Sequence, residues 1–375
     1  MTPPALHCIG LMSGTSLDGV DGVLVRFEAS AGHGLQVLAH ASRAFDPALK
    51  SELFALNAPG PNELHRAALA GNELARRYAE VVHDLLQAAG LRADEVAAIG
   101  AHGQTVRHRP GEFDGTGYTL QLLQPSLLAE LTGIAVVCDF RSRDVAAGGH
   151  GAPLAPGFHR GVFARPDREV AVLNLGGIAN LTLLAPDRPA LGFDCGPGNV
   201  LMDLWCERHL GRPYDAGGAW AATGRVVPDL LALLQAEPWL DLPPPKSTGR
   251  DLFHPGWLDA RLAAHPALAP QDVQATLCEF TASCCARHLH RHASGTAELV
   301  VCGGGAYNTH LQARLAALLP GVAVIESGAR GLPPLQVEAA AFAWLARERL
   351  EGRPGNLPEV TGAAGPRVLG GVYAP

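Results

Sequence analysis

A segment rich in glycine and hydroxyl residues, placed between two apolar runs near the N-terminus, restricts the fold of this chain more than any other feature. Residues 10–21 read GLMSGTSLDGVD, after the apolar residues 5–9 and before the apolar residues 22–27. That order predicts a strand, a tight turn and a second strand. Such a turn exposes backbone N–H groups with no bulky side chain in front of them, as a bound phosphate requires. The spacing is neither the Walker pattern nor Gly-x-Gly-x-x-Gly, so an ordinary turn remains an alternative.

Two acidic residues in the same segment favour a nucleotide over an ordinary turn. Asp18 and Asp21 are suited to bind Mg²⁺ beside phosphates or to act as a base. We take Asp18 as the candidate metal ligand, although the pattern does not separate it from Asp21. The sequence contains no His-Glu-x-x-His or similar spacing, so we do not expect a metal held by protein side chains alone.

Composition describes a globular protein of two domains. A chain of 375 residues exceeds the size at which one core usually suffices, and 47% hydrophobic against 17% charged residues excludes a disordered chain.

The net charge of −7 argues against nucleic acid or an anionic membrane as partner. We see no secretory signal pattern and no apolar run long enough to span a bilayer, so we expect a cytoplasmic protein. The eight cysteines are scattered without a Cys-x-x-Cys pair, which favours reduced, buried thiols.

Apolar runs alternate with helical periodicity along the chain, which predicts an α/β fold. We expect helices over 63–89, 123–132, 271–290 and 335–350, strands over 96–100, 134–140 and 299–302, and an irregular tail over 353–375. Residues 169–184 repeat the order strand, glycine turn, strand. This weak internal similarity to the first hairpin suggests a duplicated fold that binds its ligand between two halves.

Asp194 is the candidate catalytic residue. It follows the apolar residues 190–193 and precedes a Gly-Pro-Gly turn and a helix from about residue 200. A carboxylate at a strand end, projecting among glycines, can act as a general base. Its structural alternative is to cap the following helix, but Asn199 is better placed for that role.

Other polar segments are candidate binding sites, and most of them also have a purely structural interpretation. Arg141, Arg143 and Asp144 would bind a carboxylate or phosphate, or form a solvated ion-pair loop. Residues 102–108, with Gln104 and Thr105, suit the recognition of sugar hydroxyls. Residues 303–305 would bring backbone close to a ligand or begin a helix. Lys246, one of two lysines in the chain, would contact phosphate or substrate, or lie in a surface turn.

Taken together, these motifs resemble the anhydro-N-acetylmuramic acid kinases of bacterial cell-wall recycling. Eight segments carry the resemblance in order: 10–21, 102–107, 139–153, 173–182, 192–203, 246–250, 301–308 and 333–344. The tail at 361–367 matches as well. Each segment alone is weak, but eight in order are specific. One departure is His150, where the family usually has glutamine, and it affects one local contact.

The resemblance implies a two-lobed actin-like ATPase fold, a duplicated ribonuclease-H-like architecture with a central cleft for ATP. We expect residues 1–138 and the tail 351–375 in one lobe and residues 139–350 in the other. ATP and Mg²⁺ would be required. ATP would be bound by Gly14, Thr15, Ser16, Leu17, Asp18, Gly19, Val20, Asp21, Gly176, Gly177, Gly303, Gly304 and Gly305. The sugar would be bound by Gln104, Thr105, Arg141, Arg143 and Asp144.

The resemblance also implies an unusual reaction. Water cleaves the 1,6-anhydro bond while O6 receives the γ-phosphoryl group of ATP, giving N-acetylmuramic acid 6-phosphate and ADP. Asp194 matches the catalytic aspartate of the family, and Glu338 is a second carboxylate of the site, or simply an acid favoured at a helix N-terminus. A simple amino-sugar kinase and an ATP-gated binding module of the same superfold are the alternatives. A homodimer is left open.

Overall fold

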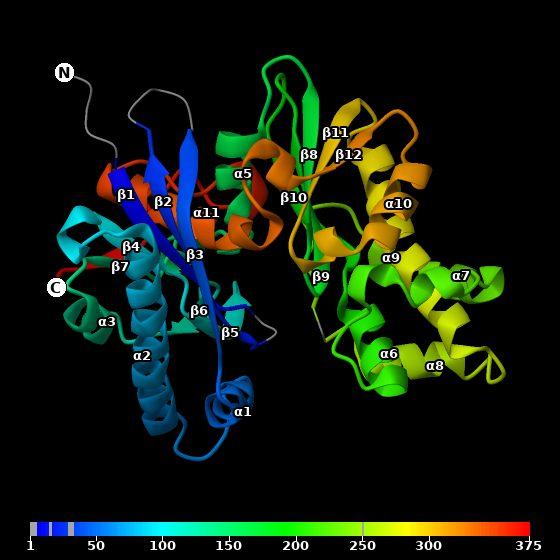
Figure 1. The fold of residues 1–375 in the computed structure, drawn as a ribbon, viewed down its shortest axis with the longest axis horizontal. Helices are drawn as coiled ribbons and strands as arrows, with labels where there is room; N and C mark the ends of the chain where they lie inside the picture. The colour runs from blue at the N-terminus through cyan, green and yellow to red at the C-terminus, as the bar shows by residue number, and fades with distance from the viewer. Residues whose placement is uncertain (1–5, 15–16, 29–33, 250) are drawn as a thin grey trace. The chain divides into compact units, whose positions relative to one another are not determined.

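The computed structural model describes residues 6–14, 17–28, 34–249 and 251–375. The chain divides into two compact units, unit 1 with Met1–Val162 and Gln336–Pro375 and unit 2 with Phe163–Leu335. Each unit contains a mixed β-sheet with helices packed against it (Figure 1). The predicted α/β fold class is therefore confirmed.

Unit 1 is built on a sheet with the strand order β13-β7-β4-β1-β2-β3. Strands β1, β2 and β3 form an antiparallel meander, β4 and β7 continue the sheet parallel to β1, and β13 pairs antiparallel with β7. The strands are β1 Leu6–Met12, β2 Gly19–Phe27, β3 Leu35–Ala44, β4 Ala98–Ala101, β7 Val136–Cys138 and β13 Gly371–Tyr373. The predicted hairpin over residues 10–21 is β1, its turn and the start of β2.

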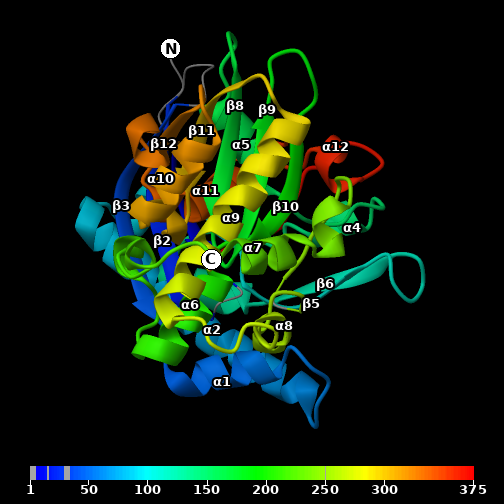
Figure 2. The ribbon, with the colours of Figure 1, turned by 90° about the vertical axis from the view of Figure 1, so that its right-hand side faces the viewer.

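Helices and a separate two-stranded ribbon complete unit 1. Figure 2 shows this ribbon, β5 Gln104–Pro110 with β6 Gly117–Leu122, as a long two-stranded arm. The helices are α1 Pro47–Ala55, α2 Glu63–Ala89, α3 Pro125–Thr132, α4 Ser142–Val145, α5 Ala155–Phe163, α11 Val337–Leu350 and α12 Pro358–Thr361. The helices predicted over 63–89, 123–132 and 335–350 are confirmed as α2, α3 and α11.

Two helices cover opposite faces of the unit 1 sheet. Side chains alternate along a strand, and Ile9 and Leu11 of β1, with Val20 of β2, belong to the buried cluster that includes the α2 residues Leu74 and Tyr78. Gly10, between Ile9 and Leu11 in β1, lies on the other face of the sheet and faces α11. Helix α2 is therefore amphipathic, whereas α11 is buried along most of its length.

Glycines on two neighbouring strands allow α11 to approach the sheet at backbone distance. A Cβ atom on Gly10 would lie 1.9 Å from the carbonyl oxygen of Ala339, and one on Gly100 of β4 would lie 2.0 Å from that of Phe342. No side chain can fit in these gaps. The glycines are thus a packing requirement, and they fix α11 against β1 and β4.

Unit 2 repeats the topology of unit 1. Its sheet has the order β10-β9-β8-β11-β12, again an antiparallel meander of three strands extended by two strands parallel to the first. The order matches β3-β2-β1-β4-β7 of unit 1, so the predicted duplication is present. The strands are β8 Glu169–Leu175, β9 Ile178–Leu184, β10 Leu191–Pro197, β11 Thr296–Cys302 and β12 Ala323–Glu326.

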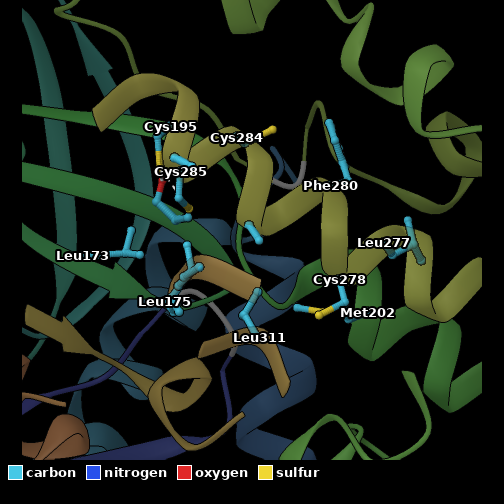
Figure 3. Packing of buried hydrophobic residues seen from close by; sticks show 14 of the residues in the cluster. Leu173, Leu175, Cys195, Met202, Leu277, Cys278, Phe280, Cys284, Cys285 and Leu311 are labelled. Carbon is cyan, nitrogen blue, oxygen red and sulfur yellow. Dashed lines mark hydrogen bonds between the residues drawn. The ribbon is translucent and has the colours of Figure 1, made fainter. Parts of the chain in front are cut away.

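A large apolar cluster lies between the unit 2 sheet and its helices. Leu173, Leu175 and Cys195 of the sheet and Leu277 and Phe280 of α9 are all buried in it (Figure 3). The helices are α6 Val200–Leu210, α7 Pro228–Gln235, α8 Pro255–Leu262, α9 Pro270–His292 and α10 Thr309–Leu318. All eight cysteines of the chain are free and buried, so the prediction of reduced, buried thiols is confirmed.

Two expectations about the C-terminal half are corrected by these contacts. Residues 139–162 and 336–350 belong to unit 1 and not to the second half, because α11 packs on β1 and β4. The segment 353–375 is not irregular throughout, since it forms α12 and adds β13 to the edge of the sheet. Within the described ranges no helix is both long and apolar enough to cross a membrane.

Adding one methyl group at Gly10 is expected to destabilise unit 1. Gly10→Ala forces α11 away from β1, and overpacking of this kind costs about 3 kcal/mol. Gly71 of α2 is the matched control, because the nearest atom to a Cβ there lies at 3.5 Å. Gly71→Ala should be neutral or stabilising, by up to about 1 kcal/mol. Chemical denaturation of both variants measures the difference, and equal stabilities would contradict the packing argument.

Candidate functional site

In unit 1, the turn between β1 and β2 is fastened to the segment that follows β4. The hydroxyl of Ser13 is buried, donates to the carbonyl of Gly103 at 3.1 Å and lies 2.8 Å from the hydroxyl of Tyr78. The side-chain amide of Gln104 donates to the carbonyl of Gly14 at 3.1 Å. Two neighbouring strand ends therefore hold the glycine-rich turn in place.

The second half of this turn has a backbone that few residues adopt. Leu17 has a φ of 57°, and its N–H donates at 3.2 Å to the carbonyl three residues earlier. Gly19 begins β2, where a Cβ would lie 2.2 Å from the carbonyl oxygen of Arg43 on β3. Thr15 and Ser16, both predicted to bind ATP, lie outside the described residues.

The two acids predicted to share the turn are separated by the structure. Asp18 is exposed at the end of the turn, and its carboxylate accepts a hydrogen bond from the ammonium of Lys50 at 3.0 Å. Asp21 lies within β2, opposite Met12, and its carboxylate is 3.9 Å from the ring of His40. Among the residues that the structure describes, no group of three His, Cys, Asp or Glu side chains could hold a metal ion. Only Asp18 is thus placed beside the turn.

The half-buried Arg141 and the buried His102 form a polar pair that reaches the same turn. Arg141 donates to the carbonyl of Gly151 at 2.8 Å and to Nε2 of His102 at 3.0 Å. Burial, aided by the charge of Arg141, lowers the pKa of His102 to about 3. A neutral imidazole that accepts at Nε2 carries its proton on Nδ1, which lies 3.2 Å from the carbonyl of Ser13. The guanidinium is thus linked through His102 to the turn.

Glu338 belongs to the same electrostatic environment. It lies in the first turn of α11, next to Ala339, which packs on Gly10. Burial lowers the pKa of Arg141 to about 10, and the negative charges of Glu338 and Asp144 oppose that shift. The predicted residues Glu338 and Arg141 are therefore close enough to interact, although they are far apart in sequence.

Asp144 has a structural role, which corrects the prediction that it binds substrate. Its carboxylate is fully buried and accepts hydrogen bonds from the N–H of Gly151 at 2.8 Å, the amide of Asn356 at 2.7 Å and the hydroxyl of Thr361 at 2.8 Å. These contacts join α4 to the C-terminal segment. Arg143, one residue earlier, is exposed.

The ribbon β5–β6 contributes a row of polar side chains. Thr105 accepts from the amide of Gln121 at 3.3 Å, the same amide donates to Thr119 at 2.8 Å, and the ring of His108 lies 3.0 Å from Thr119. Burial, with Arg141 and His150 as neighbouring positive groups, lowers the pKa of His108 to about 4. Sequence reasoning missed Thr119 and Gln121, although their i, i+2 spacing on a strand places both on one face.

Gln104 stands out at the start of this ribbon. Its side chain is buried, and its amide nitrogen donates to the carbonyl of Gly14. Within the described part of the chain, its buried oxygen Oε1 has no hydrogen-bond partner. A buried acceptor without a donor is costly, so this oxygen is suited to accept from a bound ligand.

In unit 2, the turn between β8 and β9 is held by the start of α6. The carbonyl of Gly176 accepts from the N–H of Asn199 at 2.8 Å, and that of Gly177 accepts from the N–H groups of Gly198 and Val200 at 2.9 and 3.1 Å. A Cβ on Gly177 would meet nothing within 4 Å. The carbonyl groups of the turn thus bond to the start of α6, while the Cα of Gly177 faces open space.

The glycine triplet after β11 packs tightly against the end of β8, just before this turn. Gly303 has a φ of 78°, and a Cβ there would lie 2.4 Å from the side-chain oxygen of Asn174. A Cβ on Gly305 would lie 2.6 Å from Cβ of Leu175. Gly304 begins a short 3₁₀ turn, and a Cβ there would lie 4.0 Å from the nearest atom, the side-chain nitrogen of Asn199. Gly303 and Gly305 are therefore required by packing, and Gly304 is the member that leaves room.

Asp194 lies inside β10 and not at its end, which refines its predicted position. It pairs with Asn180 of β9, and the register shifts between Asp194 and Gly196. The carboxylate is partly buried and accepts from the N–H of Thr248 at 2.9 Å. Burial raises the pKa of Asp194 to about 6, an effect that the Thr248 hydrogen bond and the charge of Lys246 reduce. This group changes protonation close to neutral pH.

Two predictions about the surroundings of Asp194 are wrong in detail. Asn199 does not cap α6 with its side chain, which instead donates to the carbonyl of Leu175 at 3.0 Å. Lys246 is neither a surface residue nor placed to contact a phosphate, because its ammonium is buried and donates to the carbonyl of Leu240 at 2.9 Å. Arg250, the last residue of that motif, lies outside the described residues.

The model of the family "Anhydro-N-acetylmuramic acid kinase" matches residues 6–375 of the chain. The chain belongs to this family. A relative named anhydro-N-acetylmuramic acid kinase from Variovorax paradoxus is 65% identical over 97% of this chain and 98% of its own length. One of the same name from Albidiferax ferrireducens is 60% identical over 97% and 98%. A ROK family glucokinase from Streptomyces griseus, solved with glucose and AMPPNP, is 14% identical with a TM-score of 0.39 over 91% of this chain and 99% of that one.

Membership of the anhydro-N-acetylmuramic acid kinase family confirms the resemblance drawn from the sequence. Within unit 1, the structure groups Gly14, Gln104, Arg141 and Glu338 around two strand ends. Within unit 2, it groups Gly176 and Gly177 with the triplet 303–305. It places Asp144 among buried structural hydrogen bonds and Asp21 within β2.

Loss of the Asp144 carboxylate should reduce stability strongly. Asp144→Ala removes the acceptor of the shortest hydrogen bonds made by three buried donors, and we expect a loss of about 3 kcal/mol in the free energy of unfolding. Arg143→Ala, at the exposed neighbouring position, should change stability by less than about 0.5 kcal/mol. Thermal and chemical denaturation compare the two. A stable Asp144→Ala protein would contradict the structural role.

Proposed function

We propose that this protein phosphorylates 1,6-anhydro-N-acetylmuramic acid and hydrolyses its anhydro bond in the same reaction. ATP donates the γ-phosphoryl group, and the products are N-acetylmuramic acid 6-phosphate and ADP. The reaction would return a sugar released from peptidoglycan to metabolism. Family membership supports the substrate, and the environment of Asp194 supports the hydrolytic step.

The observation that carries the proposal is a carboxyl group suited to proton transfer near neutral pH. A general base works best when its pKa lies near the working pH, and the pKa of Asp194 is about 6. The N–H of Thr248 holds oxygen Oδ2. We therefore assign the water molecule to Oδ1.

The chemistry of the anhydro sugar explains why water must be activated. O6 of this substrate is an ether oxygen bound to C1, so it has no proton that a base could remove. Asp194 takes a proton from water while the water oxygen bonds to C1. The C1–O6 bond breaks, O6 bonds to the γ-phosphorus, and the bond from that phosphorus to ADP breaks. Atoms and charge balance when the water proton remains on Asp194 until release.

The phosphate side of the reaction is assigned to the turn after β1. Phosphoryl transfer needs positioning and charge stabilisation more than covalent help, and Ser13 and Gly14 at the start of this turn are hydrogen-bonded to Gly103 and Gln104. The exposed carboxylate of Asp18 is an oxygen ligand of the kind Mg²⁺ prefers. Bound there, Mg²⁺ would neutralise phosphate charge after Lys50 gives up its contact. Gly176, Gly177 and Gly304 are assigned to the nucleotide as well.

The sugar is assigned to the polar side chains of unit 1. Arg141 suits the lactyl carboxylate, because a guanidinium has five N–H donors and binds carboxylates with two of them. The partnerless Oε1 of Gln104 suits a hydroxyl or amide N–H of the sugar. Thr105 supplies a hydroxyl on the same ribbon, and Glu338 orients the water or the sugar.

Replacing Asp194 is expected to abolish turnover without preventing nucleotide binding. Asp194→Asn removes the proton acceptor, a change that typically costs about 10²–10⁴-fold in rate. In the wild type, activity should fall as pH drops through about 6, because protonation removes the base form of Asp194. ADP release with 1,6-anhydro-N-acetylmuramic acid, measured from pH 5 to 8, tests both points.

Controls separate the proposal from its alternatives. Asp187→Asn, an exposed change in the same unit, should behave as wild type. N-acetylmuramic acid and N-acetylglucosamine should release little ADP; if they serve as well as the anhydro sugar, the protein is a simple amino-sugar kinase. A protein that binds ATP but releases no ADP with any sugar is a binding module. Near-normal turnover of Asp194→Asn would contradict the role of the residue.

A further inference from the structure

Lys246 is a buried cation that the proposed reaction does not use. Its ammonium donates to the carbonyls of Leu240 at 2.9 Å and Trp239 at 3.3 Å, and it lies 3.2 Å from Nε2 of His288. It also lies 4.2 Å from the centre of the Trp239 ring. Each of the three N–H donors of the ammonium group thus has one acceptor.

Packing alone does not account for a charge at this position. Removing an ammonium from water is costly even when it is hydrogen-bonded, and an apolar side chain of similar length would fill the space without that cost. Burial lowers the pKa of Lys246 to about 8, so the group is still largely charged at pH 7. Burial also lowers the pKa of His288 to about 3, which leaves a neutral ring whose Nε2 can accept from the ammonium.

The backbone on either side of this lysine braces Asp194 directly. The N–H of Asp194 donates to the carbonyl of Lys246 at 3.1 Å, and the N–H of Thr248 donates to the carboxylate of Asp194 at 2.9 Å. Residues 246–248 therefore run along the edge of β10, which is the outer strand of its sheet. The lysine side chain ties this segment to α9 through His288 and to the 3₁₀ turn Pro238–Asp241 through two carbonyls.

We propose that Lys246 is a positioning residue for Asp194: its buried ammonium anchors residues 246–248 so that their backbone holds the carboxylate in its working orientation. This role rests on the proposed function, in which Asp194 is the general base. Lys246 itself does not touch the reacting atoms. It acts through the hydrogen bonds of the segment and through its positive charge.

Lys246 is the charged group that acts on the pKa of Asp194, which it lowers. The groups that face the lysine are Cys195 of β10, Cys284, Arg287, His288 and His292 of α9, and Asp241 of the 3₁₀ turn. Burial raises the pKa of both thiols and lowers that of both histidines, so these four are neutral at pH 7. Arg287 and Asp241 form an ion pair with each other. Arg291 lies 3.7 Å from the same Asp241 carboxylate, which leaves Lys246 as the buried cation of this group.

The test measures the pH dependence of turnover in Lys246→Met, a neutral side chain of similar length. We expect kcat to fall about 10–10²-fold, as loss of orientation does, while KM for ATP changes less than about twofold. The acidic limb of the kcat/KM profile should move upward by about half a pH unit or more, because an opposite charge no longer favours the ionised carboxyl. Arg188→Met, which removes an exposed cation of unit 2, should leave the profile unchanged.

A second variant keeps the proposal testable if Lys246→Met does not fold. Thr248→Pro removes the N–H that holds the carboxylate and leaves Lys246 intact, and it should raise the acidic limb and lower kcat in the same way. An unchanged acidic limb and kcat in folded Lys246→Met, or in Thr248→Pro when the first variant is unfolded, overturns the proposal. Asp194→Asn is assayed in parallel. If that variant is active, the general-base assignment fails; if it is inactive while the lysine variant is normal, only the positioning role fails.

Discussion

The contact on which unit 1 depends is the backbone approach of α11 to β1 and β4, made possible because Gly10 and Gly100 have no side chains. The same two strands lead, within three residues of Gly10 and Gly100, into the glycine-rich turn and into His102. The first turn of the same helix carries Glu338. A single packing contact therefore aligns three candidate functional segments, and a shift of the helix would displace all of them. This is why a methyl group at Gly10 matters for the site as well as for stability.

The duplicated topology supports different chemistry in its two copies. Both units begin with a hairpin whose turn is rich in glycine, and both extend it with two parallel strands. The third strand differs: β3 of unit 1 is long and has no fully buried residue, whereas β10 of unit 2 carries Asp194 and is mostly buried, with α9 packed beside it. That burial raises the pKa of Asp194, and residues 246–248 limit the shift by a hydrogen bond. One architecture thus provides a glycine-rich turn twice and a carboxyl group with a raised pKa once.

Local patterns predicted the elements well, because periodicity and turn chemistry are local properties. Helix α2 begins and ends at the residues expected from its apolar spacing, and both hairpins form where glycine turns separate apolar runs. Long-range contacts were the difficulty. Neither the place of α11 in unit 1 nor the partners of Asp144, more than two hundred residues away, can be read from neighbouring sequence. Lys246 shows the same limit in part, since a lysine after three prolines suggests a surface turn, yet two nearby carbonyls and the distant His288 hold its ammonium in the interior.

The central claim is that water, and not a sugar hydroxyl, is the group that Asp194 activates. The most direct measurement runs the reaction with ATP and 1,6-anhydro-N-acetylmuramic acid in ¹⁸O-labelled water and locates the label in the product by mass spectrometry. If Asp194 activates water, one labelled oxygen is expected at C1 of the sugar and none in the transferred phosphoryl group. Label in the phosphoryl group, or a phosphorylated product that keeps its anhydro bond, would contradict this claim.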